Sequence, residues 1–252
     1  MQLLLRARAD ACAADAHGST PLHWACKAQR SAADAAQAVG ALLEARADPA
    51  ARTRAGSTPL HIACEVGAAA CADSLLAAGA EAVTLTLTLN LTLALTLTPT
   101  LTLTLTPTPT LTLKGVANAD GVTPLHAAAA AGSEACLGAL LGAGAPLEAR
   151  LVFEGRHELS QQQESTSKTA LYLAAEKGHA AAVGCLLQHG ADPHAHALLS
   201  TAQAASRLSP LWAARRGGHA DVEAMLVAAG ATELAEAVPL PGEEPPGTEL
   251  SS

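Results

Sequence analysis

A five-residue motif recurs along the chain, and its spacing limits the possible folds more than any other feature of the sequence. Ser-Thr-Pro-Leu-His occupies 19–23 and 57–61, and Val-Thr-Pro-Leu-His occupies 122–126. Weaker copies, Lys-Thr-Ala-Leu-Tyr and Leu-Ser-Pro-Leu-Trp, follow at 168–172 and 208–212. An internal repeat of this length indicates a stack of similar units rather than a single globule.

The distances within each copy are also regular. Each motif is followed by an alanine-rich stretch and then by a second apolar stretch. From the motif threonine, or serine in the last copy, to the closing glycine is 21 residues in four copies, as from Thr58 to Gly79. The first copy, from Thr20 to Arg46, is 26 residues long, and the connection from Arg46 to Thr58 adds 12. The 21-residue unit and the 12-residue connection together give a period of 33 residues.

This pattern resembles the ankyrin-repeat family, whose repeat contains a turn, a Thr-Pro-Leu-His helix start and two antiparallel helices. The resemblance covers about residues 3–232, as a partial repeat at 3–18 followed by five repeats. It implies an all-α solenoid of helix-turn-helix units with β-hairpin finger loops. It also implies structural roles for the motif residues: the threonine caps the helix, the proline fits the first turn, the leucine enters the core and the histidine hydrogen-bonds within and between repeats. These residues are Thr20, Pro21, Leu22, His23, Thr58, Pro59, Leu60, His61, Thr123, Pro124, Leu125 and His126.

Long insertions interrupt the repeats. The segment 83–114 is almost pure alternation of threonine and leucine, which is a strand pattern. We interpret it as a low-complexity insertion or a retained non-coding stretch, because a membrane crossing there would put neighbouring repeats on opposite sides of a bilayer. The insertion at 151–167 is expected to be a solvated loop. The predicted organisation is a partial repeat plus two repeats at 1–82, three repeats at 115–238, and a disordered acidic proline-rich tail at 239–252.

Charge and cysteine content restrict the function. The formal net charge of −8 disfavours non-specific binding to nucleic acid and docking on an anionic membrane. The six cysteines form no Cys-x-x-Cys pair and are interpreted as buried thiols in a reducing compartment. The first residues lack the pattern of a secretory signal, so a cytoplasmic protein is expected, with the nucleus as a second possibility.

Sequence signatures of an enzyme are missing. The chain has no glycine-rich phosphate loop, no Gly-x-Ser-x-Gly and no His-Glu-x-x-His. Possible zinc ligands lie within twelve residues at Cys185, His189, His194 and His196. Because Cys185 falls on the apolar helix face, we interpret these histidines as surface or capping residues, with a zinc site as the alternative. No catalytic residue, cofactor or metal is expected.

Binding of a partner protein by a monomeric adaptor or scaffold is therefore the predicted function. In proteins that resemble this one, partners dock on the concave side, which is formed by the finger tips and the first helix of each repeat. In register, the finger-tip positions are Asp15, His17, Arg52, Arg54, Asn118 and Asp120. The first-helix positions are Lys27, Glu65, Glu176, Lys177, Arg215 and Arg216.

Two other functional interpretations stay open. The chain could be a regulatory piece of a larger enzyme or channel. It could also be a degenerate or mispredicted product without a selected function, because it contains the threonine–leucine run and because Tyr172 and Trp212 replace the expected histidines.

Overall fold

The computed structural model of the protein describes residues 10–28, 32–79, 116–156, 163–200, 205–232 and 235–238. The expected threonine–leucine insertion and the expected tail lie outside these residues. By its internal contacts the chain divides into two units, Met1–Ala119 with Thr123–Pro146, and Asp120–Val122 with Leu147–Ser252. None of the helices in the described ranges has the length and apolar character needed to cross a membrane.

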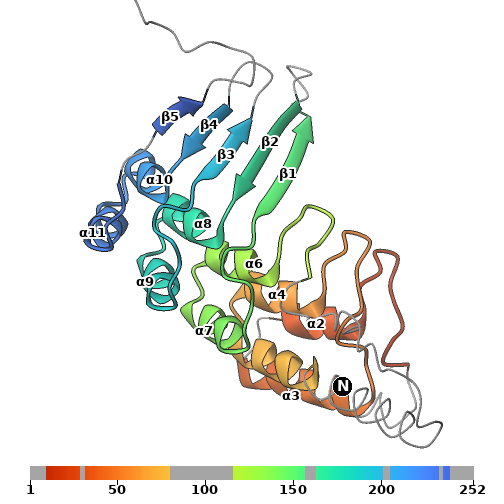
Figure 1. The fold of residues 1–252 in the computed structure, drawn as a ribbon. Coiled ribbons are helices and arrows are strands. Elements are labelled where there is room, and N and C mark those ends of the chain that lie inside the picture. Colours follow the sequence, from red (N-terminus) through yellow and green to blue (C-terminus); the bar gives the residue numbers. More distant parts are fainter. Residues whose placement is uncertain are drawn as a thin grey trace, which may run out of the picture. The chain divides into compact units, whose positions relative to one another are not determined.

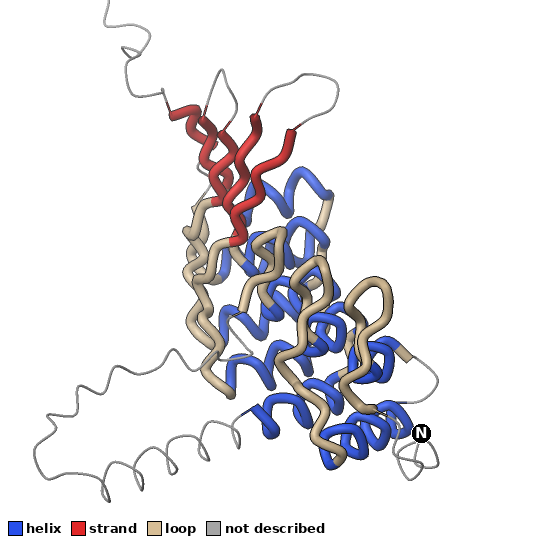
Figure 2. Tube along the Cα trace, turned by 90° about the vertical axis from the view of Figure 1, so that its right-hand side faces the viewer, coloured by secondary structure: helices blue, strands red, loops and turns tan. Residues whose placement is uncertain are grey.

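The first unit is built of helix pairs. The pairs are α2 (Pro21–Lys27) with α3 (Ala32–Glu44), α4 (Pro59–Val66) with the helical stretch 69–79, and α6 (Pro124–Ala131) with α7 (Glu134–Gly142). The first helices α2, α4 and α6 lie side by side in that order (Figure 1). The loops between successive pairs project as a row of fingers beside these helices (Figure 2).

The Thr-Pro-Leu-His motif starts each first helix of this unit for a local reason. The threonine is an extended N-cap residue, and the proline takes a first-turn position where its missing N–H breaks no helical hydrogen bond. The backbone N–H of Thr58 donates to Nδ1 of His61 at 3.1 Å, and Oγ1 of Thr58 lies 2.9 Å from the same nitrogen. The same contacts recur in the motifs at 19–23 and 122–126, so the histidine closes the first turn each time.

The motif also links one repeat to the next. His23 is only 3% exposed, and its Nε2 lies 3.1 Å from the carbonyl oxygen of Ser57, which belongs to the following repeat. The motif leucines Leu22, Leu60 and Leu125 are fully buried. Burying a leucine side chain contributes roughly 1.5–3 kcal/mol, so each motif supplies both a helix start and a core residue.

A left-handed residue ends the second helix of most repeats. Gly144, Gly190 and Gly230 take this conformation with φ of 79°, 87° and 87°. In the first repeat the position belongs to Arg46, whose φ is 62°. Arg46 is the one residue other than glycine with a positive φ in the described part of the chain. Left-handed backbone is unfavourable for a residue with a Cβ atom.

The second unit combines helix pairs with a sheet. Its helices are α8 (Ala170–Lys177) with α9 (Ala180–Gln188) and α10 (Pro210–Gly217) with α11 (Ala220–Ala228). Its strands are β1 (Leu151–Arg156), β2 (Gln163–Lys168), β3 (Ala197–Ser200), β4 (Ala205–Leu208) and β5 (Ala235–Val238). The five strands follow chain order in one sheet, and each neighbouring pair is antiparallel (Figure 1).

The prediction of a solvated loop at 151–167 was wrong, because most of this insertion is a β-hairpin. β1 pairs with β2 from Leu151 opposite Lys168 to Arg156 opposite Gln163. The extra residues lengthen the finger, and β2 then pairs with β3 of the next finger. The helix pairs confirm the expected repeat solenoid with hairpin fingers. In this unit, neighbouring fingers also pair with one another and form one continuous sheet.

Candidate partner-binding face

Asp15 organises the finger turn that precedes α2. Its carboxylate accepts hydrogen bonds from the backbone N–H of His17 at 2.8 Å, from that of Ser19 at 2.9 Å and from the indole Nε1–H of Trp24 at 3.1 Å. The bond from Ser19 contributes most to holding the pKa of Asp15 below its ordinary value. The three N–H donors fix the carboxylate in the turn, and the carboxylate in turn fixes the indole of Trp24.

Trp24 is a large apolar side chain in contact with water. It is 53% exposed, and among the large apolar side chains described only Val227 on α11 is comparably exposed, at 51%. The ammonium of Lys27 lies 5.5 Å from the centroid of the Trp24 ring, within the range of a cation–π contact. Because the ring is held from two sides and its surface is exposed to water, Trp24 is a candidate anchor for a binding partner.

Neighbouring fingers of the first unit are joined through their backbones. The N–H of Arg54 donates to the carbonyl oxygen of His17, and the N–H of Ala119 donates to that of Ala55, both at 2.9 Å. Gly56 permits this approach, because a Cβ atom there would lie 3.0 Å from the Ala119 nitrogen and its φ is +75°. The finger tips therefore hold a fixed spacing.

The first helices and the fingers share one surface, which we name the Trp24 face. Its apolar part consists of the residues that lie four positions after each motif threonine. Its charged part includes Arg52, whose Nη2 donates to the carbonyl oxygen of Ala117 at 2.6 Å. The Trp24 face consists of Trp24, Ile62, Ala127, Asp15, His17, Lys27, Arg52, Arg54 and Glu65.

The structure distributes the expected partner-binding residues over both units. Those exposed on the Trp24 face are Asp15, His17, Lys27, Arg52, Arg54 and Glu65. Asn118 is half-buried, with its amide 3.5 Å from the hydroxyl of Ser57, whereas Asp120 is exposed. In the second unit Lys177 and Arg216 are exposed. Arg215 is exposed as well and forms an ion pair with Glu223, and the half-buried Glu176 forms one with Lys168.

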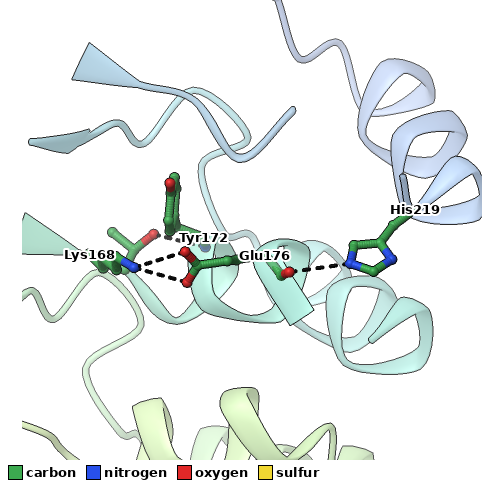
Figure 3. A network of polar contacts seen from close by, with 5 residues as sticks. Lys168, Tyr172, Glu176 and His219 are labelled. Atoms are coloured by element: carbon green, nitrogen blue, oxygen red, sulfur yellow. Dashed lines mark hydrogen bonds and ion pairs between the residues drawn. The ribbon is translucent and has the colours of Figure 1, made fainter. Parts of the chain in front are cut away.

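A polar network surrounds the fourth motif, where Tyr172 stands in place of histidine. The ammonium of Lys168 lies 2.9 and 3.0 Å from the two carboxylate oxygens of Glu176 and 5.3 Å from the centroid of the Tyr172 ring (Figure 3). Burial, followed by the charge of Glu176, raises the pKa of Tyr172 to about 12. On the other side, Nε2–H of His219 donates to the carbonyl oxygen of Glu176 at 3.2 Å (Figure 3).

The finger sheet covers part of the first helices in the second unit. Tyr172 and Trp212 pack in one apolar cluster with Ala197 and Leu208, which lie at the base of the β3–β4 hairpin. Leu173, at the position that corresponds to Trp24, is 9% exposed. The position that corresponds to Trp24 in the fifth motif is Ala213, which is 3% exposed and belongs to the same cluster, so the finger covers part of the equivalent surface in this unit.

Comparison with known protein families identifies the family to which these repeats belong. Residues 1–85 match the description "Ankyrin repeats (3 copies)", and residues 120–150 and 167–197 match "Ankyrin repeat". Together the matches span more than half of the 252 residues. The chain belongs to the ankyrin-repeat family. Ankyrin repeats generally mediate protein–protein interactions. A search of curated proteins finds no match to the chain.

The ankyrin register explains why Trp24 was not among the residues expected to face a partner. Expected positions were chosen at finger tips and at the charged end of each first helix. Trp24 lies four residues after Thr20, a position taken by Ile62 and Ala127 in the next two repeats. The signal available in the sequence was this shared helix position, but only the contact with Asp15 shows that the indole is held at the surface.

The candidate zinc ligands of the fourth ankyrin repeat make separate local contacts. Nδ1 of His189 lies 2.9 Å from the carbonyl oxygen of Cys185 and 3.9 Å from its sulfur. Nδ1 of His194 lies 3.4 Å from the hydroxyl of Thr232. Within the residues that the structure describes, no group of three or more His, Cys, Asp or Glu side chains is arranged to hold a metal ion.

Four buried cysteines fill equivalent core positions of the ankyrin repeats. Cys26 and Cys64 follow the motif threonine by six residues, whereas Cys71 and Cys136 follow it by thirteen, and each is at most 1% exposed. Hydrogen bonding between the partners Cys26 and Cys71, and between Cys64 and Cys136, raises the pKa of the first thiol of each pair and lowers that of the second. Later repeats use fully buried alanines at these positions, Ala129 and Ala182, so the thiols act as core residues.

Proposed function

We propose that this chain is a non-catalytic adaptor that binds a partner protein through the Trp24 face. The observation that carries the proposal is the 53% exposure of Trp24 combined with the two contacts that hold its ring. Removing a large aromatic surface from water on binding is strongly favourable, and little side-chain entropy is lost when the ring is already held.

The surroundings of Trp24 support the same function. Protein interfaces commonly place an aromatic anchor in the centre and polar residues at the rim. Here Ile62 and Ala127 continue the apolar surface along α4 and α6, and exposed Lys27 and Glu65 flank it. The hydrogen bonds between fingers fix the rim, so this surface is largely formed before a partner arrives.

The residues that could perform chemistry have structural tasks. His23 and His61 are 3% exposed and bonded to their motif threonines, which leaves them poorly placed to exchange protons with a substrate. The proposal therefore includes no cofactor and no nucleic-acid ligand. We also propose that the protein is a monomer and that it acts in the cytoplasm or the nucleus.

The substitutions in the fourth and fifth motifs support a functional protein over a degenerate one. Tyr172 is 2% exposed, and its ring packs with that of Trp212 in a cluster that replaces the histidine contacts of earlier repeats. Both aromatic side chains therefore contribute to a packed core in this unit.

Affinity capture with mass spectrometry tests the proposal on the full chain. The variant is Trp24→Ala, and the matched control is Val227→Ala, which removes the other exposed apolar side chain. We expect a specific partner with wild type and with Val227→Ala, and its loss with Trp24→Ala at unchanged circular dichroism. Capture of the same proteins by all three forms, or of none by any, would refute the adaptor function at this face.

A further inference from the structure

The charges around Trp24 indicate what kind of partner it takes. Lys27, Arg52 and Arg54 are all exposed on the Trp24 face. The chain as a whole carries a formal charge of −8, so a face with three exposed cations differs in sign from the net charge of the chain. Such a local reversal of sign favours ligands of negative charge at that place.

The carboxylates on the same face do not cancel this preference. Asp15 already accepts three N–H hydrogen bonds, which stabilise its charge within the turn. Glu65 is the other carboxylate, and it lies on α4, one helix away from Lys27. The Trp24 face therefore keeps an excess of one positive charge, because three cations stand against two carboxylates.

The face also has an apolar part, so a ligand must offer more than negative charge to match it. Trp24, Ile62 and Ala127 occupy the same register position on three neighbouring helices, and their side chains decrease in size in that order. Ile62 and Ala127 are half-buried, which leaves the indole as the most prominent apolar group. A ligand that covers this row needs an apolar side chain seated on the Trp24 ring.

We infer that the Trp24 face takes an extended acidic segment of a partner protein, with an apolar side chain of that segment on the Trp24 ring and its carboxylates beside Lys27 and Arg54. The inference rests on the proposed function and gives the chemistry of the partner. A nucleic acid is also anionic, but it carries a charge on every phosphate, so the overall negative charge of the chain opposes it more strongly than a segment with a few carboxylates. The backbone N–H of Arg54 donates to the His17 carbonyl, which fixes the backbone of this second cation beside the finger turn that Asp15 organises.

Intrinsic fluorescence can report on this site directly, because the chain contains two tryptophans. The change Trp212→Phe leaves Trp24 as the one indole in the full chain and keeps an aromatic ring in the cluster around Tyr172. Random dodecapeptides displayed on phage are selected against this variant. The enriched peptides are then synthesised and titrated while Trp24 emission is followed, and oligo-dT serves as the nucleic-acid probe.

We expect the enriched peptides to combine Asp or Glu with an apolar residue and to change the emission of Trp24. Changing Lys27→Gln with Arg54→Gln is expected to weaken binding about tenfold, which corresponds to about 1.4 kcal/mol. The control Lys177→Gln with Arg216→Gln removes two exposed cations of the second unit and is expected to leave affinity unchanged. Added salt is expected to weaken binding to the parent protein more than to the Lys27/Arg54 variant.

Several outcomes would overturn the inference. These are enrichment of basic or neutral peptides, acidic peptides that leave Trp24 emission unchanged, equal losses in both double variants, tighter binding of oligo-dT, or no enrichment at all. The adaptor proposal fails separately, because it depends on capture of a partner that requires Trp24. A partner captured in that way without acidic peptides would keep the adaptor function and reject only its acidic ligand.

Discussion

Arg215 and Glu223 form an ion pair of 2.8 Å at two positions that are apolar in the preceding repeat. They follow the motif residue Ser209 by six and fourteen residues, and the equivalent residues one repeat earlier are Ala175 and Val183, both fully buried. The side chains of the ion pair are 40% and 36% exposed. The last described repeat thus presents a polar surface where the preceding repeat presents an apolar one.

Replacing this ion pair by apolar residues should cause self-association. The variant Arg215→Ala with Glu223→Val is expected to lose at most about 1 kcal/mol of stability, because exposed ion pairs contribute little. It exposes the surface on which a repeat normally stacks, so sedimentation velocity should show concentration-dependent dimers. The control Lys177→Ala with Asp221→Val changes the same types of residue elsewhere on the unit and should stay monomeric. Equal behaviour of the two variants would contradict this explanation.

Changing Arg46→Gly should stabilise the protein. Arg46 takes a left-handed φ of 62°, which costs a residue with a Cβ atom roughly 1–2 kcal/mol. The greater freedom of glycine in the unfolded chain cancels part of this, so a net gain of about 0.5–1 kcal/mol is expected. Urea unfolding measures it. The control Glu44→Gly, which lies in the helix two residues earlier, should instead destabilise the protein. A loss of stability from Arg46→Gly would contradict the prediction and show that the arginine side chain makes a stabilising contact.

The repeats could be predicted from the sequence because each carries its own start and stop signals. Thr58 and Pro59 begin α4, and the left-handed Gly67 ends it, all within a few residues. The pairing of β2 with β3 could not be predicted in this way. It joins Ser165 to Ser200 through backbone bonds between two fingers, and neither finger carries the alternation typical of a half-buried strand.

The exposed residues of the candidate binding face could be predicted from the sequence, but the place of Trp24 on that face could not. Register alone placed Lys27 and Arg54 on an exposed face. The prominence of Trp24 depends on a hydrogen bond to Asp15, nine residues away in the preceding turn. Which side chain a turn will hold at the surface is decided by three-dimensional contacts, and propensity and spacing do not contain that information.

The single tyrosine of the chain should titrate at unusually high pH. Burial and Glu176 raise the pKa of Tyr172 to about 12 from an ordinary 10.0. For an acid with a raised pKa, this contribution to stability is present below pH 10 and is lost as the pH rises towards 12. Ultraviolet absorbance during a base titration follows this one phenol, and ionisation is expected to accompany unfolding. Glu176→Gln should lower the midpoint, and an ordinary midpoint in the folded wild type would contradict the buried position.

Acid should weaken the first repeat through His23. Burial lowers the pKa of this imidazole below 6.5, although its bond to the Ser57 carbonyl and the charge of Asp15 oppose the shift. The unfolded chain therefore binds the proton more readily, and stability falls as the pH drops below 6.5. Urea midpoints at neutral and mildly acidic pH measure this loss. His23→Gln should be less stable at neutral pH but less sensitive to acid, whereas the exposed His17→Gln should behave as wild type.

Two glycines with nearly equal backbone angles should tolerate alanine differently. Gly178 and Gly218 have φ of +76° and +73°. A Cβ atom at Gly178 would overlap the ring of His219, whereas at Gly218 nothing lies within 4 Å. Gly218→Ala is expected to cost roughly 1–2 kcal/mol for the backbone, and Gly178→Ala about 1–3 kcal/mol more for the overlap.

Chemical denaturation compares these two alanine variants, and His219→Ala provides the control. Added to Gly178→Ala, it should recover much of the extra loss because it removes the ring that the methyl group meets. Equal costs for the two alanine variants would mean that the His219 ring moves aside freely.

The sheet formed by the fingers changes how the second unit comes apart. In a stack held only by its helices, an outer repeat can fray after losing one packed interface. Here β4 pairs with both β3 and β5, and β2 pairs with β3, so detaching the last helix pair also means unzipping a β-ladder. The last two repeats should therefore melt as a single cooperative block, with amide protons on the helices and on the fingers exchanging together.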